Sequence, residues 1–141
     1  MNILISACLL GQYCRYDGQV KNYRQVQALL GRDDIHLIPV CPEQAGGLAT
    51  PRPPAERQGE RVVTADGTDV TAQYRRGAEA ALYLARLFHC TKAILKEKSP
   101  SCGHGQIYDG TFSRTLTAGD GVTAALLRAE GLEIVGESDL L

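Results

Sequence analysis

The sequence lacks an excess of charge of either sign. Its 141 residues include 15 basic and 16 acidic side chains, interspersed along the chain, and the formal net charge is −1. Proteins that bind a nucleic-acid polymer or an anionic membrane usually carry a basic patch or stripe. The composition therefore predicts neither as a partner and favours a small molecule.

Long apolar runs are absent as well. The first apolar run, Ile3-Leu4-Ile5, is soon interrupted and is not preceded by a basic segment. The sequence therefore predicts neither a signal peptide nor a membrane span, and a cytoplasmic location is the expectation. A chain of 141 residues is the size of one ordinary domain, so we expect a single domain over residues 1–141.

A disulfide framework is a third feature that the sequence does not suggest. Its five cysteines are an odd number, in a chain without a secretion signal. Such a set indicates metal-binding or catalytic thiols. No Cys-x-x-Cys pair occurs, which disfavours a zinc ribbon but not a site built from distant loops.

Short apolar runs alternate with segments of helical spacing. Runs at 2–6, 35–40, 61–64, 92–96 and 132–135 predict strands, and 23–30, 69–88 and 122–129 predict helices, with Asp69 or Thr68 and Asp120 as caps. This alternation predicts an α/β fold, a mainly parallel sheet flanked by helices in a Rossmann-like three-layer sandwich.

Three local features refine that fold. Pro39 suggests either that the strand pairing ends there or that the strand lies at an edge, because proline cannot donate to a second neighbouring strand. Gly77 suggests a close backbone approach to its helix. Residues 44–59, rich in glycine and proline, predict a long functional loop without secondary structure.

Three cysteines follow predicted strands. Cys8 and Cys41 come directly after the first two runs, and Cys102 follows the run at 92–96 through a turn that contains Ser99 and Ser101. The carboxyl ends of parallel strands meet at one edge, where such sheets bind ligands, so we expect these thiols to converge. Thiolates suit an iron-sulfur cluster or zinc, and three of them leave one coordination position open.

Other residues leave alternatives open. Cys14 is either a fourth ligand or an incidental loop cysteine, and Cys90, which precedes its strand, is expected to be an ordinary buried cysteine. His104, close to Cys102, leaves open a hydrolase with a cysteine nucleophile and a histidine base. A noncatalytic iron-sulfur or zinc-binding protein is a further alternative, and it would bind metal without turnover. Glu43 is a general acid or base if burial raises its pKa, and otherwise a solvated loop carboxylate.

Several motifs occur in a fixed order along nearly the whole chain. They are Ser6-Ala7-Cys8-Leu9-Leu10-Gly11, Arg15-Tyr16-Asp17-Gly18, Pro39-Val40-Cys41-Pro42-Glu43, Ala45-Gly46-Gly47-Leu48, Pro51-Arg52-Pro53-Pro54-Ala55-Glu56, Lys98-Ser99-Pro100-Ser101-Cys102-Gly103 and Ile107-Tyr108-Asp109-Gly110. Together they resemble the thiouracil desulfidase family, long catalogued as a domain of unknown function. The resemblance implies a 4Fe-4S cluster held by Cys8, Cys41 and Cys102, with one iron free to bind the substrate sulfur.

The same resemblance implies a reaction. Thiolated pyrimidines (2-thiouracil, 4-thiouracil or a 4-thiouridine nucleotide) would be converted to the oxo compound and hydrogen sulfide without net electron transfer. In this pattern Glu43 activates water or moves protons, and Ser99 assists in positioning and proton transfer. Cys14 does not belong to the pattern and is expected to lie outside the coordination sphere. Substrate-binding roles are expected for three more residues: Ser101, Arg52 and Tyr108.

Overall fold

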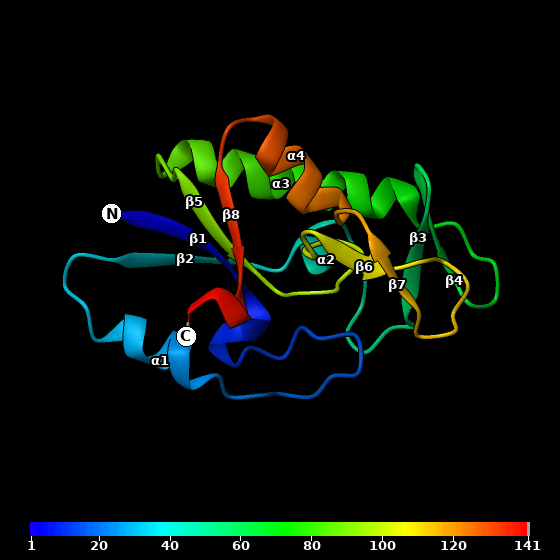
Figure 1. The fold of residues 1–141 in the computed structure, drawn as a ribbon, viewed down its shortest axis with the longest axis horizontal. Coiled ribbons are helices and arrows are strands. Elements are labelled where there is room, and N and C mark those ends of the chain that lie inside the picture. The colour runs from blue at the N-terminus through cyan, green and yellow to red at the C-terminus, as the bar shows by residue number, and fades with distance from the viewer. Residues whose placement is uncertain (141) are drawn as a thin grey trace.

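A four-stranded parallel sheet forms the centre of the computed structural model, which describes residues 1–140 (Figure 1). Its strands are β1 (Asn2–Ser6), β2 (His36–Val40), β5 (Lys92–Leu95) and β8 (Glu133–Gly136), in the order β2-β1-β5-β8. Each pair of neighbours is parallel. This sheet confirms the predicted α/β fold.

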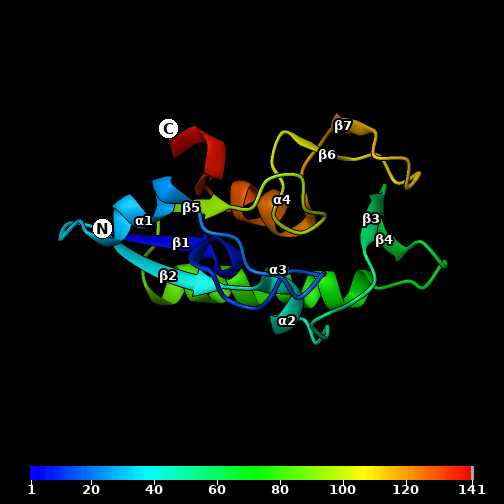
Figure 2. The same cartoon turned by 90° about the horizontal axis from the view of Figure 1, so that it is seen from below.

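Helices cover both faces of the sheet (Figures 1 and 2). On one face, α3 (Thr71–Leu87) and α4 (Val122–Ala129) pack on Leu4 and its neighbours, and on the other, α1 (Arg24–Leu30) packs on Ile3 and Ile5. The second face is completed by two 3₁₀ helices, η1 (Ala7–Leu10) and η2 (Glu137–Leu140). Strands buried on both faces explain why their apolar runs are continuous rather than alternating. Within residues 1–140, no helix has the length and apolar character that a membrane crossing needs.

The edge position predicted from Pro39 is confirmed. β2 lies at the end of the sheet and pairs only with β1, where Pro39 stands opposite Ile5. A proline in this strand removes a donor that has no second strand to meet.

Two antiparallel hairpins extend beyond the carboxyl edge of the sheet (Figure 1). One joins β3 (Ala55–Gln58) to β4 (Arg61–Thr64), and the other joins β6 (Gln106–Tyr108) to β7 (Leu116–Ala118). The prediction that residues 44–59 lack secondary structure is therefore wrong. A short helix, α2 (Pro42–Ala45), begins before this segment, and β3 forms within it because β4 provides its hydrogen-bond partners.

The predicted cap of the last helix is also wrong. Gly121 occupies the position before α4, and no side chain caps that end. The Asp120 carboxylate instead accepts a hydrogen bond from the Gly105 backbone N–H at 2.8 Å. The N-cap of α3 is Val70 rather than Thr68 or Asp69, although the Asp69 carboxylate accepts the Thr71 N–H at 2.9 Å.

Glycines bring α2 and α3 into direct backbone contact. A Cβ atom on Gly77 would lie 1.9 Å from the Pro42 carbonyl oxygen, and one on Gly46 would lie 1.9 Å from the Gln73 carbonyl oxygen. Neither distance is physically possible, so the close approach predicted for Gly77 is confirmed. It fixes the position of α2, which carries Glu43 two residues after Cys41.

Candidate active site

A cavity of about 600 Å³ opens at the carboxyl edge of the sheet. Its wall includes Cys8, Cys41, Cys102, Glu43 and Ser99. The three cysteines follow β1, β2 and β5, which are neighbours in the sheet. The structure thus brings together the thiols that the sequence places after separate strands.

Cys8 and Cys41 form the more open side of this cavity, and Cys14 lines it as well. Cys14 is only 3% exposed, and its thiol interacts with those of Cys41 and Cys8. The Cys41 Sγ atom also lies 3.7 Å from the Cys14 carbonyl oxygen. The hydrogen bond from Cys14 lowers the pKa of Cys41 to about 7, and the bonds to Cys41 and Cys8 raise the pKa of Cys14. The arrangement favours a thiolate at Cys41 and a protonated thiol at Cys14.

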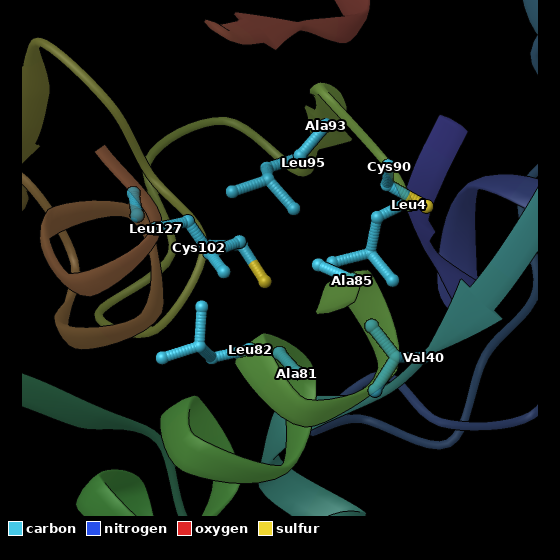
Figure 3. Packing of buried hydrophobic residues seen from close by; sticks show 11 residues of the cluster. Leu4, Val40, Ala81, Leu82, Ala85, Cys90, Ala93, Leu95, Cys102 and Leu127 are labelled. Atoms are coloured by element: carbon cyan, nitrogen blue, oxygen red, sulfur yellow. The ribbon is translucent and has the colours of Figure 1, made fainter. Parts of the chain in front are cut away.

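Cys102 forms the closed side of the cavity. It is 3% exposed and lies among Leu82, Leu95 and Leu127 of the core (Figure 3), and burial raises the pKa of its thiol well above the ordinary value. The Ser99 Oγ atom accepts the backbone N–H groups of Ser101 and Cys102, both at 3.0 Å. Because these bonds use only the oxygen, the Ser99 hydroxyl hydrogen is free to be donated into the cavity.

Ser101 does not reach the cavity wall. It is fully buried, its Oγ atom lies 2.8 Å from Thr123 Oγ1, and Cys102 Sγ donates to it over 3.9 Å. The expectation that Ser101 binds substrate therefore does not fit its position. The Ser101 side chain stabilises the turn through its contact with Thr123. Gly121 also packs against this turn, so closely that an added Cβ would lie 2.4 Å from the Ser101 carbonyl.

An ion pair joins Glu43 to Arg52 inside the cavity wall. The Arg52 Nη2 atom donates to Glu43 Oε2 at 3.0 Å, and their side chains are 6% and 14% exposed. Burial raises the pKa of Glu43, although the positive charge of Arg52 acts in the opposite direction. Glu43 is therefore a largely buried carboxylate rather than a solvated one, as a general base requires.

Arg52 is also bonded to the backbone around it. Its Nη2 atom donates to the Cys14 carbonyl oxygen at 2.9 Å, and Nη1 donates to Ala49 O and Thr50 Oγ1, both at 3.2 Å. Both terminal nitrogens are thus engaged within the chain. Arg52 and Tyr108, which is part of β6, both line the cavity, and their expected substrate contacts remain predictions.

Two buried nitrogens in this wall have no hydrogen-bond partner within residues 1–140. They are Arg15 Nη1 and Arg52 Nε. A buried donor without a partner costs about 1–3 kcal/mol, and more when it is charged, so such atoms in a native structure require an explanation. Arg15 lies within the Arg15-Tyr16-Asp17-Gly18 motif, but the sequence alone predicts no site role for it.

The remaining candidates lie outside the cavity. The His104 ring lies 3.4 Å from Asp139 Oδ2 and 3.2 Å from Arg128 Nη2, and His104 is not part of the cavity wall. The structure therefore does not form the cysteine–histidine pair that a hydrolase would need. Cys90 is 7% exposed and packs in the core near Leu4, which confirms its structural role (Figure 3).

The donor set suits a cluster. Within the described residues, no three His, Cys, Asp or Glu side chains converge closely enough to hold a single ion. Thiolates bound to different irons of a cluster are spaced more widely than thiolates bound to one zinc ion, in which each sulfur is about 2.3 Å from the metal. Cys8, Cys41 and Cys102 come from three separate segments and line one cavity, a donor set that suits such a cluster.

Comparison with known proteins gives three matches. The family description "2-thiouracil desulfurase" matches residues 3–139. The uncharacterized protein YbbK of Bacillus subtilis (strain 168) is 43% identical in an alignment of 148 positions, which covers 98% of this chain and 97% of that protein. A solved structure of the 4Fe-4S-dependent thiouracil desulfidase TudS is 53% identical, with a TM-score of 0.91 over 99% of this chain and 92% of that one.

Proposed function

Because the chain belongs to the 2-thiouracil desulfurase family, we propose that it hydrolyses the carbon–sulfur double bond of thiolated pyrimidines. One water is consumed, the thiocarbonyl carbon becomes a carbonyl, and the sulfur leaves as hydrogen sulfide, so no electrons are gained or lost. The observation that carries this proposal is one cavity lined by four cysteines, among them Cys8, Cys41 and Cys102, together with a buried carboxylate and a free hydroxyl. The similarity to TudS supports it.

Cys8, Cys41 and Cys102 are the proposed ligands of a 4Fe-4S cluster. Such a cluster, when bound by three thiolates, supplies an iron with an open position that acts as a Lewis acid toward the substrate sulfur. Cys14 remains outside the ligand set, since it is buried beside Cys8 and Cys41 as a hydrogen-bonding thiol. A fourth thiolate would fill the position that the substrate needs.

Glu43 is the proposed general base. Its carboxylate lies in the cavity wall and is held by Arg52, so it can accept a proton from the water that attacks the thiocarbonyl carbon. The raised pKa makes it a stronger base than an exposed carboxylate. Arg52 keeps this side chain ionised and oriented.

Ser99 and Tyr108 are the proposed substrate contacts. The Ser99 oxygen is anchored by two backbone N–H groups, so its hydroxyl hydrogen can be donated to a pyrimidine nitrogen or to the departing sulfur. Tyr108 reaches the same cavity from the β6–β7 hairpin. The substrate is thus a small thiolated pyrimidine, either the free base or its nucleotide.

The test uses protein that has been reconstituted with iron and sulfide without oxygen. We expect release of hydrogen sulfide and formation of the oxo pyrimidine in equal amounts from 2-thiouracil, 4-thiouracil or 4-thiouridine monophosphate. Comparing the three compounds identifies the preferred form. A protein that binds the cluster but releases no sulfide from any of them would contradict the proposal and would favour a noncatalytic iron-sulfur protein.

A further inference from the structure

The two nitrogens without partners belong to arginines beside the same pair of cysteines. Arg15 Nη1 and Arg52 Nε are both buried, and both side chains line the cavity that contains Cys8 and Cys41. No other buried side-chain nitrogen or oxygen in residues 1–140 lacks a partner. Two unpaired donors in the same cavity wall point to a hydrogen-bond acceptor that binds beside Cys8 and Cys41.

Arg52 is fixed beside Cys41 by a shared carbonyl group. The Cys14 carbonyl oxygen accepts from Arg52 Nη2 at 2.9 Å and lies 3.7 Å from Cys41 Sγ. Because Nη1 and Nη2 are bonded to other groups of the chain, the guanidinium plane cannot rotate without breaking several bonds. Nε is therefore the one nitrogen of Arg52 left to meet a group in the cavity.

Arg15 is fixed in a similar way on the side of Cys8. Its Nε and Nη2 atoms donate to the two carboxylate oxygens of Asp17, both at 3.3 Å, and its charge interacts with the Cys8 thiol. This fork leaves Nη1 without a partner. Each arginine thus has a counter-ion, Asp17 or Glu43, on one side and an unused donor on the other.

We infer that Arg15 Nη1 and Arg52 Nε donate hydrogen bonds to the sulfur atoms of the bound cluster and its thiolate ligands at Cys8 and Cys41. This inference rests on the cluster of the proposed function. A 4Fe-4S core of charge 2+ with three thiolates carries a net charge of about −1, so its sulfurs are strong acceptors for a guanidinium N–H group. Hydrogen bonds to sulfur also set the reduction potential of such clusters.

The depth of the two donors favours the cluster over the substrate. The Arg52 side chain is 6% exposed and that of Arg15 is 15% exposed, so both lie below the open part of the cavity. The cysteines line the same cavity as the two arginines, whereas the proposed substrate contacts, Tyr108 and Ser99, are only half-buried. The two arginines are therefore positioning residues for the cofactor.

The experiment compares anaerobically reconstituted wild type with Arg15→Gln and Arg52→Lys. The lysine variant keeps the charge beside Glu43 but loses the Nε donor. Arg114→Gln is the matched control, because Arg114 lines the same cavity but is exposed. The readouts are the rate of iron release to a chelator and the midpoint potential of the cluster, and circular dichroism of the cluster-free proteins checks their folding.

We expect each of the two variants to release iron about 10-fold faster than wild type, and its potential to be lower, while Arg114→Gln behaves as wild type. Release rates and potentials equal to those of wild type, in folded variants, would overturn the inference. A raised KM with unchanged release rate and potential would also overturn it and would show that the arginines bind the substrate instead. If the wild type itself takes up no iron, the proposed function fails together with the inference. If the wild type takes up the cluster and the two variants behave as it does, the inference alone fails.

Discussion

The two sides of the cavity hold their cysteines by different means. Cys8 and Cys41 are partly exposed and are surrounded by polar groups: the Cys14 thiol and two guanidinium groups. Cys102 is buried among apolar side chains on a turn that Ser99 ties together. The polar groups around Cys8 and Cys41 influence the charge of these thiols, whereas the packing around Cys102 fixes the position of its thiol.

This difference has a consequence for chemistry. A cysteine thiol must lose its proton to bind iron. On the polar side a hydrogen bond favours the thiolate form of Cys41, whereas burial disfavours the thiolate form of Cys102. We therefore expect the polar side to govern how readily the cluster is acquired and how it reacts, and the buried side to govern where it is held.

The largest effect should come from Glu43 on the polar side. Glu43→Gln keeps the shape of the side chain but removes the carboxylate proposed as the general base, so the rate of sulfide release should fall about 10²–10⁴-fold. Iron content should stay at the wild-type level, because Glu43 is not a proposed ligand. Loss of iron in this variant, or an unchanged rate, would contradict the assigned role.

The backbone contact between α2 and α3 should come next. Gly77→Ala places a Cβ atom 1.9 Å from the Pro42 carbonyl oxygen, so α2 must shift. We expect the free energy of unfolding to fall by about 1–3 kcal/mol, as overpacking does, and sulfide release to fall with it, because Glu43 moves. Thermal and urea unfolding measure the first effect.

Gly31→Ala serves as the control for that change. Gly31 has a φ angle of −85°, and an added Cβ would lie 3.9 Å from the Ala28 carbonyl oxygen, an ordinary contact. Its stability should remain within about 1 kcal/mol of wild type. Equal losses in both variants would show that the approach at Gly77 is not the cause.

The turn at Cys102 should give a smaller effect. Ser99→Ala leaves the N–H groups of Ser101 and Cys102 without their acceptor, and losing a comparable cap costs about 0.5–2 kcal/mol. Ser99→Thr retains the hydroxyl and should preserve most of the stability and turnover. A Thr variant as impaired as the Ala variant would argue against the hydroxyl as the functional group.

The smallest effect is a shift of pH dependence. Burial raises the pKa of Glu43, and the base must be ionised, so activity is present above this pKa and is lost as the pH falls through it. The acidic limb of kcat/KM should therefore lie above the range of an ordinary glutamate, about 4.3. The residual activity of Glu43→Gln should lack this limb, and a limb that persists there would belong to another group.

Much of this architecture is predictable because it depends on local patterns. Apolar runs and helical spacing identify the central strands and α3, and the rule for parallel sheets places Cys8, Cys41 and Cys102 at one edge. The edge position of Pro39 follows from its missing donor alone. These inferences need no knowledge of distant contacts.

The features that sequence reasoning missed depend on such contacts. β3 is a strand because β4 pairs with it, and Asp120 bonds to Gly105 rather than to α4. Ser101 looks like a substrate ligand in the sequence, but in the fold it is buried against Thr123, outside the cavity wall. Which side chain meets which partner is set by tertiary packing, and no local pattern encodes it.

The measurement that tests the account most directly is the iron and acid-labile sulfide content of protein reconstituted without oxygen. Wild type should be compared with Cys8→Ser, Cys41→Ser, Cys102→Ser and Cys14→Ser. We expect about four irons and four sulfides per chain in wild type, their loss in the first three variants, and their retention in Cys14→Ser. Iron-free wild type, or loss of the cluster in Cys14→Ser as well, would contradict a three-thiolate cluster with an open iron.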